Sequence, residues 1–180
     1  ADSVNEIVDI RCKQMKEHGS KRGFKEDIEL ILFCANSKEK QIRLIALTIV
    51  KKLFELEVGW NASEFDEQRY NALCMGFAIK GPRIISDLLV QNYADEIDLL
   101  LEIAVFSSAH LYIRRKYIDL LLKPLMLFTL PANLIHHRIL ALTAIKHCML
   151  PTEQTCTSFT VQGPHVQDIW EIVDSSSGSL

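Results

Sequence analysis

The histidines are the residues whose chemistry could most readily build a site, but their spacing argues against a shared one. His136 and His137 are adjacent, so on a helix their side chains point about 100° apart and do not face one metal ion. His147 lies ten residues beyond His137, too far along a helix to complete a compact site. We therefore predict that each is a surface histidine or a hydrogen-bonded core histidine.

The cysteines and carboxylates give no stronger sign of a reactive site. The five cysteines are widely spaced and include no Cys-x-x-Cys pair, so a zinc site of the usual spacing is not expected. Free thiols instead indicate a reducing compartment, which predicts a cytoplasmic or nuclear location. Asp95 and Asp98 can share a helix face, but carboxylates at a helix start commonly interact with the helix dipole.

The sequence also lacks the motifs that mark common enzymes. A Gly-rich phosphate-binding loop, a His-Glu-x-x-His pair and a Gly-x-Ser-x-Gly elbow are all missing from the 180 residues. We therefore predict that the chain is not an enzyme and holds neither a cofactor nor a metal. A compact helical enzyme with a polar pocket is the lesser alternative.

Helices are the elements that must position these side chains. Hydrophobic residues make up 48% of the chain, while Gly (7) and Pro (5) are scarce. Because few residues favour tight turns, long segments can run without interruption, which predicts an all-α fold. No charge-free apolar run reaches the roughly 18 residues of a membrane span, so we expect no membrane contact.

Apolar residues at helical spacing predict about eight helices within residues 1–150. Ser37 is expected to cap the third helix, and Gly81-Pro82 to end the fourth and open the fifth. Pro124 is expected to bend or end the seventh helix, and Pro131 to start the eighth.

Two features predict how closely these helices pack. The third helix has so wide an apolar arc that other helices must cover it from more than one direction. Gly76 lies inside the fourth helix, where Gly costs about 1 kcal/mol relative to Ala. We expect a neighbouring helix to approach closely at Gly76 and to compensate for that cost.

Residues 151–180 are predicted to form a polar tail after a helical-repeat domain at residues 1–150. A short helix is expected at about 165–174, where Ile169, Trp170, Ile172 and Val173 come together, and the end of the chain is rich in Ser and Gly. Such a helix fits a segment that docks back on the domain or one that anchors another chain.

Three short segments resemble one another and a known class of helical repeats. Gln41–Leu47 is similar to the helix of HEAT and armadillo repeats in which an aliphatic–Arg pair precedes a small residue by three positions, here Arg43 and Ala46. Looser copies surround Arg114 and Arg138. The resemblance implies an irregular right-handed α-solenoid, in which such arginines form hydrogen-bonded struts between neighbouring units. A compact helical bundle is the alternative architecture.

Charge is distributed in bands along the chain, although the net charge is only −3. Residues 1–52 carry a net +3, residues 53–102 a net −7, residues 103–150 a net +5 and residues 151–180 a net −4. In a solenoid these segments would form charged bands along the molecule that steer a partner. They also fit the solvated faces of ordinary amphipathic helices.

The combined pattern predicts a protein–protein interaction or assembly scaffold from a larger intracellular protein, which binds another protein or a peptide and could also self-associate. Aromatic residues and arginine dominate most interfaces, so we predict partner-binding roles for Trp60, Arg114, Arg115, Lys116, Arg138 and Trp170. The alternative is a nucleic-acid-binding helical-repeat module. The acidic pI of about 6.1 makes nucleic acid an unlikely partner.

Overall fold

The computed structural model describes residues 6, 8–14, 23–58 and 67–150. Within these ranges the chain is helical and has no strand, which confirms the predicted all-α class. None of the described helices has the length and apolar composition needed to cross a membrane. Residues 8–14 are helical, and the later elements are α2 (Gly23–Ala35), α3 (Lys40–Val58), α4 (Glu67–Gln91), the short 3-10 helix η1 (Ala94–Glu96), α5 (Ile97–Ser108), α6 (Leu111–Leu120), α7 (Leu122–Phe128) and α8 (Ile135–Cys148).

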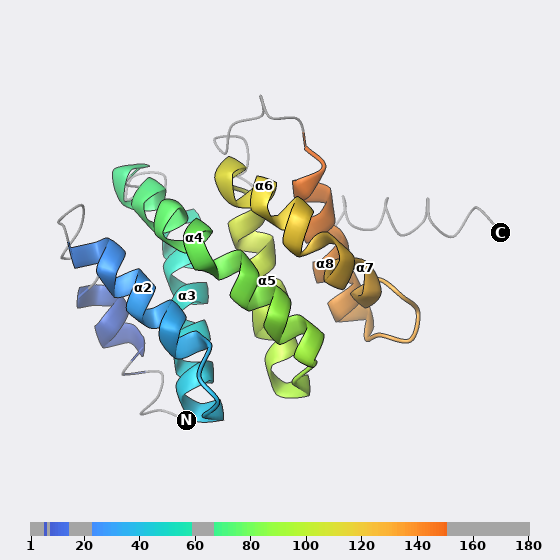
Figure 1. The fold of residues 1–180 in the computed structure, drawn as a ribbon, viewed down its shortest axis with the longest axis horizontal. Coiled ribbons are helices and arrows are strands. Elements are labelled where there is room, and N and C mark those ends of the chain that lie inside the picture. The colour runs from blue at the N-terminus through green and yellow to red at the C-terminus, as the bar shows by residue number, and fades with distance from the viewer. Residues whose placement is uncertain (1–5, 7, 15–22, 59–66, 151–180) are drawn as a thin grey trace.

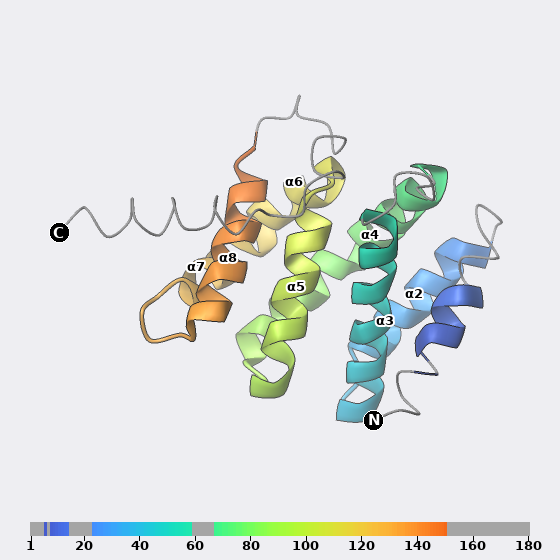
Figure 2. The same ribbon diagram turned by 180° about the vertical axis from the view of Figure 1, so that it is seen from behind.

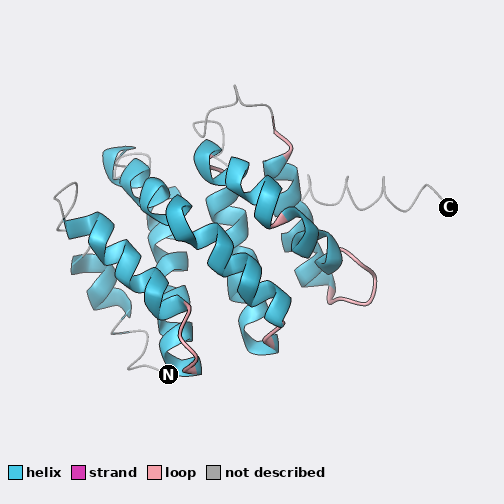
Figure 3. Ribbon diagram, viewed as in Figure 1, coloured by secondary structure: helices cyan, strands magenta, loops and turns pink. Residues whose placement is uncertain are grey.

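The helices α2 to α8 form two layers. In Figure 1 the front layer consists of α2, α4, α6 and α7. In the reverse view of Figure 2 the back layer, which consists of α3, α5 and α8, is nearer the viewer. Within the front layer α4 packs between α2 and α6, and within the back layer α5 packs between α3 and α8. From α2 to α8 each α-helix contacts the next one in the sequence, and short described loops join α2 to α3 and α4 to η1 (Figure 3).

The core lies between these layers and is mainly apolar, with a smaller set of buried polar and charged residues. Phe54 of α3 and Phe77 of α4 are fully buried and meet edge to face, with ring centroids 5.2 Å apart. Helix α5 is buried on several sides, since Leu100, Leu101 and Ile103 all lie in the core. The wide apolar arc expected for α3 packs against α2, α4 and α5, although Ile42 at one end of that arc is exposed.

The predicted break at Gly81-Pro82 is wrong, because α4 runs through both residues as one helix. Proline inside a helix costs about 3 kcal/mol. In α4 the buried residues lie on one side of the helix both before and after the proline. Phe77 comes before Pro82, and Ile84 and Leu88 come after it. Burial of both halves in the same core therefore outweighs the local signal of the Gly-Pro pair.

The seventh predicted helix is divided, but at Leu121 rather than at Pro124. Pro124 lies in the first turn of α7 and has no N–H to donate to the carbonyl of Leu120, four residues earlier. The Ser86 hydroxyl on α4 donates to that carbonyl instead, at 2.7 Å. A side chain from a neighbouring helix thus satisfies the acceptor that the proline releases.

Two predicted helix starts are displaced. Helix α3 starts at Lys40, and the hydroxyl of Ser37 accepts a hydrogen bond from the backbone N–H of Glu39 within the preceding loop. Helix α8 starts at Ile135 rather than at Pro131. The side chain of Asn133 donates to the carbonyl of Leu127 at 2.8 Å and stabilises the longer α7–α8 loop.

We expect the two glycines of α4 to respond differently to substitution by alanine. A Cβ atom at Gly76 would lie 3.4 Å from Ile28 of α2, which confirms the predicted close approach and leaves space for a methyl group. A Cβ atom at Gly81 would lie 2.5 Å from the buried ring of Phe77. Gly76→Ala should change the free energy of unfolding by less than about 1 kcal/mol. Gly81→Ala should lower it by about 1–3 kcal/mol.

Urea denaturation of both variants measures these changes, with the parent chain as reference. Equal destabilisation by the two substitutions would contradict the packing described at Phe77.

Candidate functional site

Three arginines occupy the same position in three helices and bind the loop before each one. Arg43, Arg114 and Arg138 are the fourth residues of α3, α6 and α8. Arg43 Nη1 donates to the carbonyls six and five residues earlier, at 2.8 and 3.1 Å. Arg114 donates to the carbonyls at the same two offsets, at 3.2 and 3.0 Å. Arg138 Nε donates to the carbonyl of Thr129 at 3.1 Å.

Arg43 also joins one helix pair to the next through a buried ion pair. Its Nε lies 3.0 and 2.9 Å from the two carboxylate oxygens of Glu96, and its Nη2 lies 2.7 Å from one of them. Arg43 is 4% exposed and Glu96 is not exposed at all. Hydrogen bonding to Glu96 raises the pKa of Arg43 despite burial. The ring of Tyr93 covers the guanidinium, with 4.4 Å from Cζ to the ring centroid.

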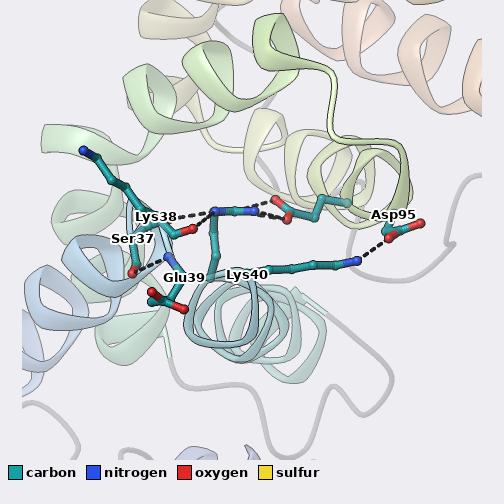
Figure 4. Close-up of polar contacts among 7 residues, drawn as sticks. Ser37, Lys38, Glu39, Lys40 and Asp95 are labelled. Carbon is teal, nitrogen blue, oxygen red and sulfur yellow. Dashed lines mark hydrogen bonds and ion pairs between the residues drawn. The ribbon is translucent and has the colours of Figure 1, made fainter.

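Further ion pairs follow the same boundary between α3 and the region of η1 and α5. Figure 4 shows Lys40 reaching Asp95 beside the loop that contains Ser37 and Lys38. Lys51 lies 2.6 Å from Glu102. These contacts join the basic segment 1–52 to the acidic segment 53–102. Part of the predicted charge banding is therefore neutralised inside the molecule.

Four of the six residues predicted to bind a partner lie within the described ranges, and they differ in exposure. Arg114 is 3% exposed, and its Nη1 donates to the carbonyl of Leu150 at 3.4 Å, so it lies in the interior and links α6 to the end of α8. Arg115 and Lys116 are exposed on α6, and Arg138 is half-buried. The other two, Trp60 and Trp170, lie outside the described residues, as does the whole predicted tail.

His147 is a core histidine with hydrogen-bond partners, which is one of the two alternatives that the sequence left open. Its Nδ1 donates to the carbonyl of Val105 at 3.0 Å and lies 3.0 Å from the Ser108 hydroxyl. Burial lowers the pKa of His147 to about 4, so the ring is neutral at neutral pH. Burial also raises the pKa of the neighbouring Cys148 thiol to about 11. Both groups therefore stabilise the packing of α8 on α5 rather than offering a base or a nucleophile.

The adjacent histidines meet the same carboxylate, which the sequence did not predict. His137 Nε2 lies 2.5 Å from Asp98 Oδ1, and His136 Nε2 lies 3.7 Å from the same oxygen. Because Asp98 lies in the first turn of α5 beside the start of α8, both rings can reach it from their different directions. Among the described residues, no three His, Cys, Asp or Glu side chains are grouped as metal ligands would be.

The front layer exposes large apolar side chains, and this surface is the candidate functional site. Phe33 is 78% exposed at the end of α2, and Met75 and Val90 on α4 are 62% and 70% exposed. Sequence reasoning missed this surface because it sought core residues and charged side chains. The available signal was apolar residues that fall outside the core-facing stripe of their helix. We define the front apolar face as the exposed large apolar side chains of α2, α4, α6 and α7, which are Leu30, Phe33, Met75, Ile79, Val90, Ile118, Met126 and Leu127.

We expect Glu96→Leu to destabilise the fold by about 3–5 kcal/mol, since it leaves the buried Arg43 guanidinium without its counter-ion, and Arg43→Met to destabilise it by leaving the Glu96 carboxylate buried alone. The paired variant Arg43→Met/Glu96→Leu should lose much less, because neither charge then remains buried alone. Urea denaturation of the single and double variants measures the coupling. Additive losses in this cycle would show that the two side chains do not act as a pair.

We also expect the fold to lose stability in acid through His147. Its pKa of about 4 in the folded chain lies below the usual value of 6.5, so between these values the unfolded chain binds more protons. The contribution of His147 to the free energy of unfolding is complete above about pH 6.5 and is lost as the pH falls towards 4. It amounts to about 3 kcal/mol.

Urea denaturation between pH 7 and pH 4 measures this loss. His147→Asn keeps a donor for Val105 and should make the free energy of unfolding depend less steeply on pH. His110, whose pKa burial also lowers, contributes with the same sign in every variant. A slope that His147→Asn does not alter would contradict the assignment.

Comparison with known proteins does not assign this chain to a family. No protein-family model matches it, and searches of curated proteins and of solved structures found no significant match. The functional conclusion therefore depends on the surface and the contacts of the molecule itself.

Proposed function

We propose that this chain is a non-enzymatic protein-interaction or assembly scaffold within a larger intracellular protein, built as an irregular right-handed α-solenoid. Apart from α6 and α7, which share the front layer, successive helices alternate between two layers, and this alternation supports the solenoid. The resemblance to HEAT and armadillo repeats adds to this support, because Arg43 and Arg114 bind both their own loop and the neighbouring helix pair.

The front apolar face is the observation that carries the functional proposal. Soluble proteins seldom expose contiguous apolar patches of more than a few hundred Å², and larger ones commonly mark binding surfaces. Phe33, Met75 and Val90 are all more than 60% exposed, and they belong to neighbouring helices of one layer. Removing these side chains from water on binding would stabilise a complex.

The chemistry of this face indicates the kind of partner. A large aromatic side chain such as Phe33 is a typical anchor for an interface, and Met adapts to irregular apolar surfaces. The exposed Arg115 and Lys116 of α6 lie in the same layer and would add charge at the rim of the interface. The partner is thus a folded protein or an amphipathic peptide with apolar anchors and acidic flanks.

Affinity capture from cells that contain the chain tests this function. The unmodified chain should retain specific proteins, identified by mass spectrometry. Phe33→Glu/Ile79→Glu should weaken their retention by about tenfold or more, because each buried anchor typically contributes more than 1 kcal/mol.

The matched control is Ile10→Glu/Ile42→Glu, which introduces the same two charges at exposed positions outside the front layer. Far-UV circular dichroism checks that both variants stay helical. Equal retention by the Phe33/Ile79 variant and the unmodified chain would exclude the front apolar face as the binding surface.

A further inference from the structure

Helix α8 has an unusual distribution of side chains, because it buries its small and polar residues. Ala141, Ala144 and Cys148 face the core together with His137 and His147. His137 pairs with Asp98 and His147 with Val105 at the boundary with α5. Most of the large aliphatic residues of α8 therefore lie elsewhere on the helix.

Leu140 and Ile145 pack against the core, but the other large aliphatic residues of α8, with Met149 directly after it, lie on the outward side. Ile135 and Met149 are 60% and 72% exposed, and Ile139 and Leu142 are partly exposed. Their spacing of three and four residues places all four on one side of the helix, with Lys146 as the charged residue among them. An exposed helix face is ordinarily polar, so this side has the composition of a covered surface.

The described helices leave this side uncovered. Helix α8 packs against α5, α6 and α7, and these contacts account for its buried residues. We propose that the outward face of α8, formed by Ile135, Ile139, Leu142 and Met149, is the docking site of residues 165–174 of the same chain. This inference is independent of the proposed function, which concerns the front layer.

The sequence of this segment matches the face that it would cover. Val166, Ile169, Trp170 and Val173 follow one another at intervals of three, one and three residues, which is the spacing of a single apolar stripe on a helix. Asp168 and Glu171 fall on the other side of that helix together with Ile172, and Asp174 borders the stripe. One amphipathic helix could thus place its apolar stripe on α8 and keep its acids in water.

The connecting chain is long enough to allow this return. Residues 151–164 separate the end of the described helices from the segment, and fourteen residues span up to roughly 46 Å when extended. Helix α8 has 14 residues and is therefore only about 21 Å long. The segment can reach any point along α8 in either direction.

Charge and size favour this occupant over a second copy of the chain. The segment is acidic, whereas residues 103–150 carry a net +5 with Lys146 exposed beside the docking site. Four aliphatic side chains are also far fewer than the roughly 20–30 residues that each partner contributes to a stable interface. A segment on the same chain needs less area, because its effective concentration is of the order of millimolar.

Tryptophan fluorescence of the full chain tests the proposal. The chain has two tryptophans, so Trp60→Phe leaves Trp170 as the single reporter. We expect blue-shifted emission from Trp170 and several-fold weaker quenching by acrylamide than for free tryptophan. Adding Ile135→Glu/Met149→Glu should shift the emission to that of a solvated indole and restore quenching.

Phe33→Glu/Ile79→Glu in the same background is the matched control, and it should leave the emission of Trp170 unchanged. Far-UV circular dichroism verifies that each variant is folded. Solvated emission from Trp170 before any change to α8 would overturn the proposal. So would protection that persists in the α8 variant, or that appears only at protein concentrations where light scattering detects a dimer.

Discussion

The ion pair between Arg43 and Glu96 is the constraint on which the rest of the fold depends. Two charges removed from water cost several kcal/mol each unless hydrogen bonds satisfy them. Glu96 receives bonds from two nitrogens of Arg43, and the remaining donor of Arg43 binds the α2–α3 loop. These bonds fix the start of α5 against the start of α3, and α5 in turn packs against α6 and α8.

The same solution recurs along the molecule with different partners. A helix start and the preceding helix end leave backbone groups without partners, and a two-layer array brings many such ends together. Arg114 satisfies the carbonyls of Ser108 and Ala109, and Arg138 that of Thr129. An arginine in the fourth position of a helix suits this task because its several donors can bind two or more carbonyls at once. These residues hold the helices together, so a charged type in a helix is not by itself a sign of an exposed binding residue.

The sequence was informative where burial repeats regularly and less so where single residues act through distant partners. The all-α class and the close contact at Gly76 followed from periodicity and composition, whereas His147 was left as either a surface or a core histidine. The continuity of α4 could not be predicted in this way. Gly81-Pro82 indicates a break locally, although the buried side of the helix continues through both residues. Glu96 as the partner of Arg43 could not be predicted, since the two lie 53 residues apart and charge type alone does not choose among many carboxylates. The front apolar face was missed because exposure is a property of the packed helices.

The hydrogen bond from Ser86 to the carbonyl of Leu120 has a consequence for how this sequence can change over time. Pro124 is tolerated because a hydroxyl on another helix replaces the N–H that it lacks. The serine and the proline are therefore one unit under selection, although they are remote in the chain. A lineage that loses the hydroxyl would be expected to replace the proline as well, and substitutions at these two sites should arise together.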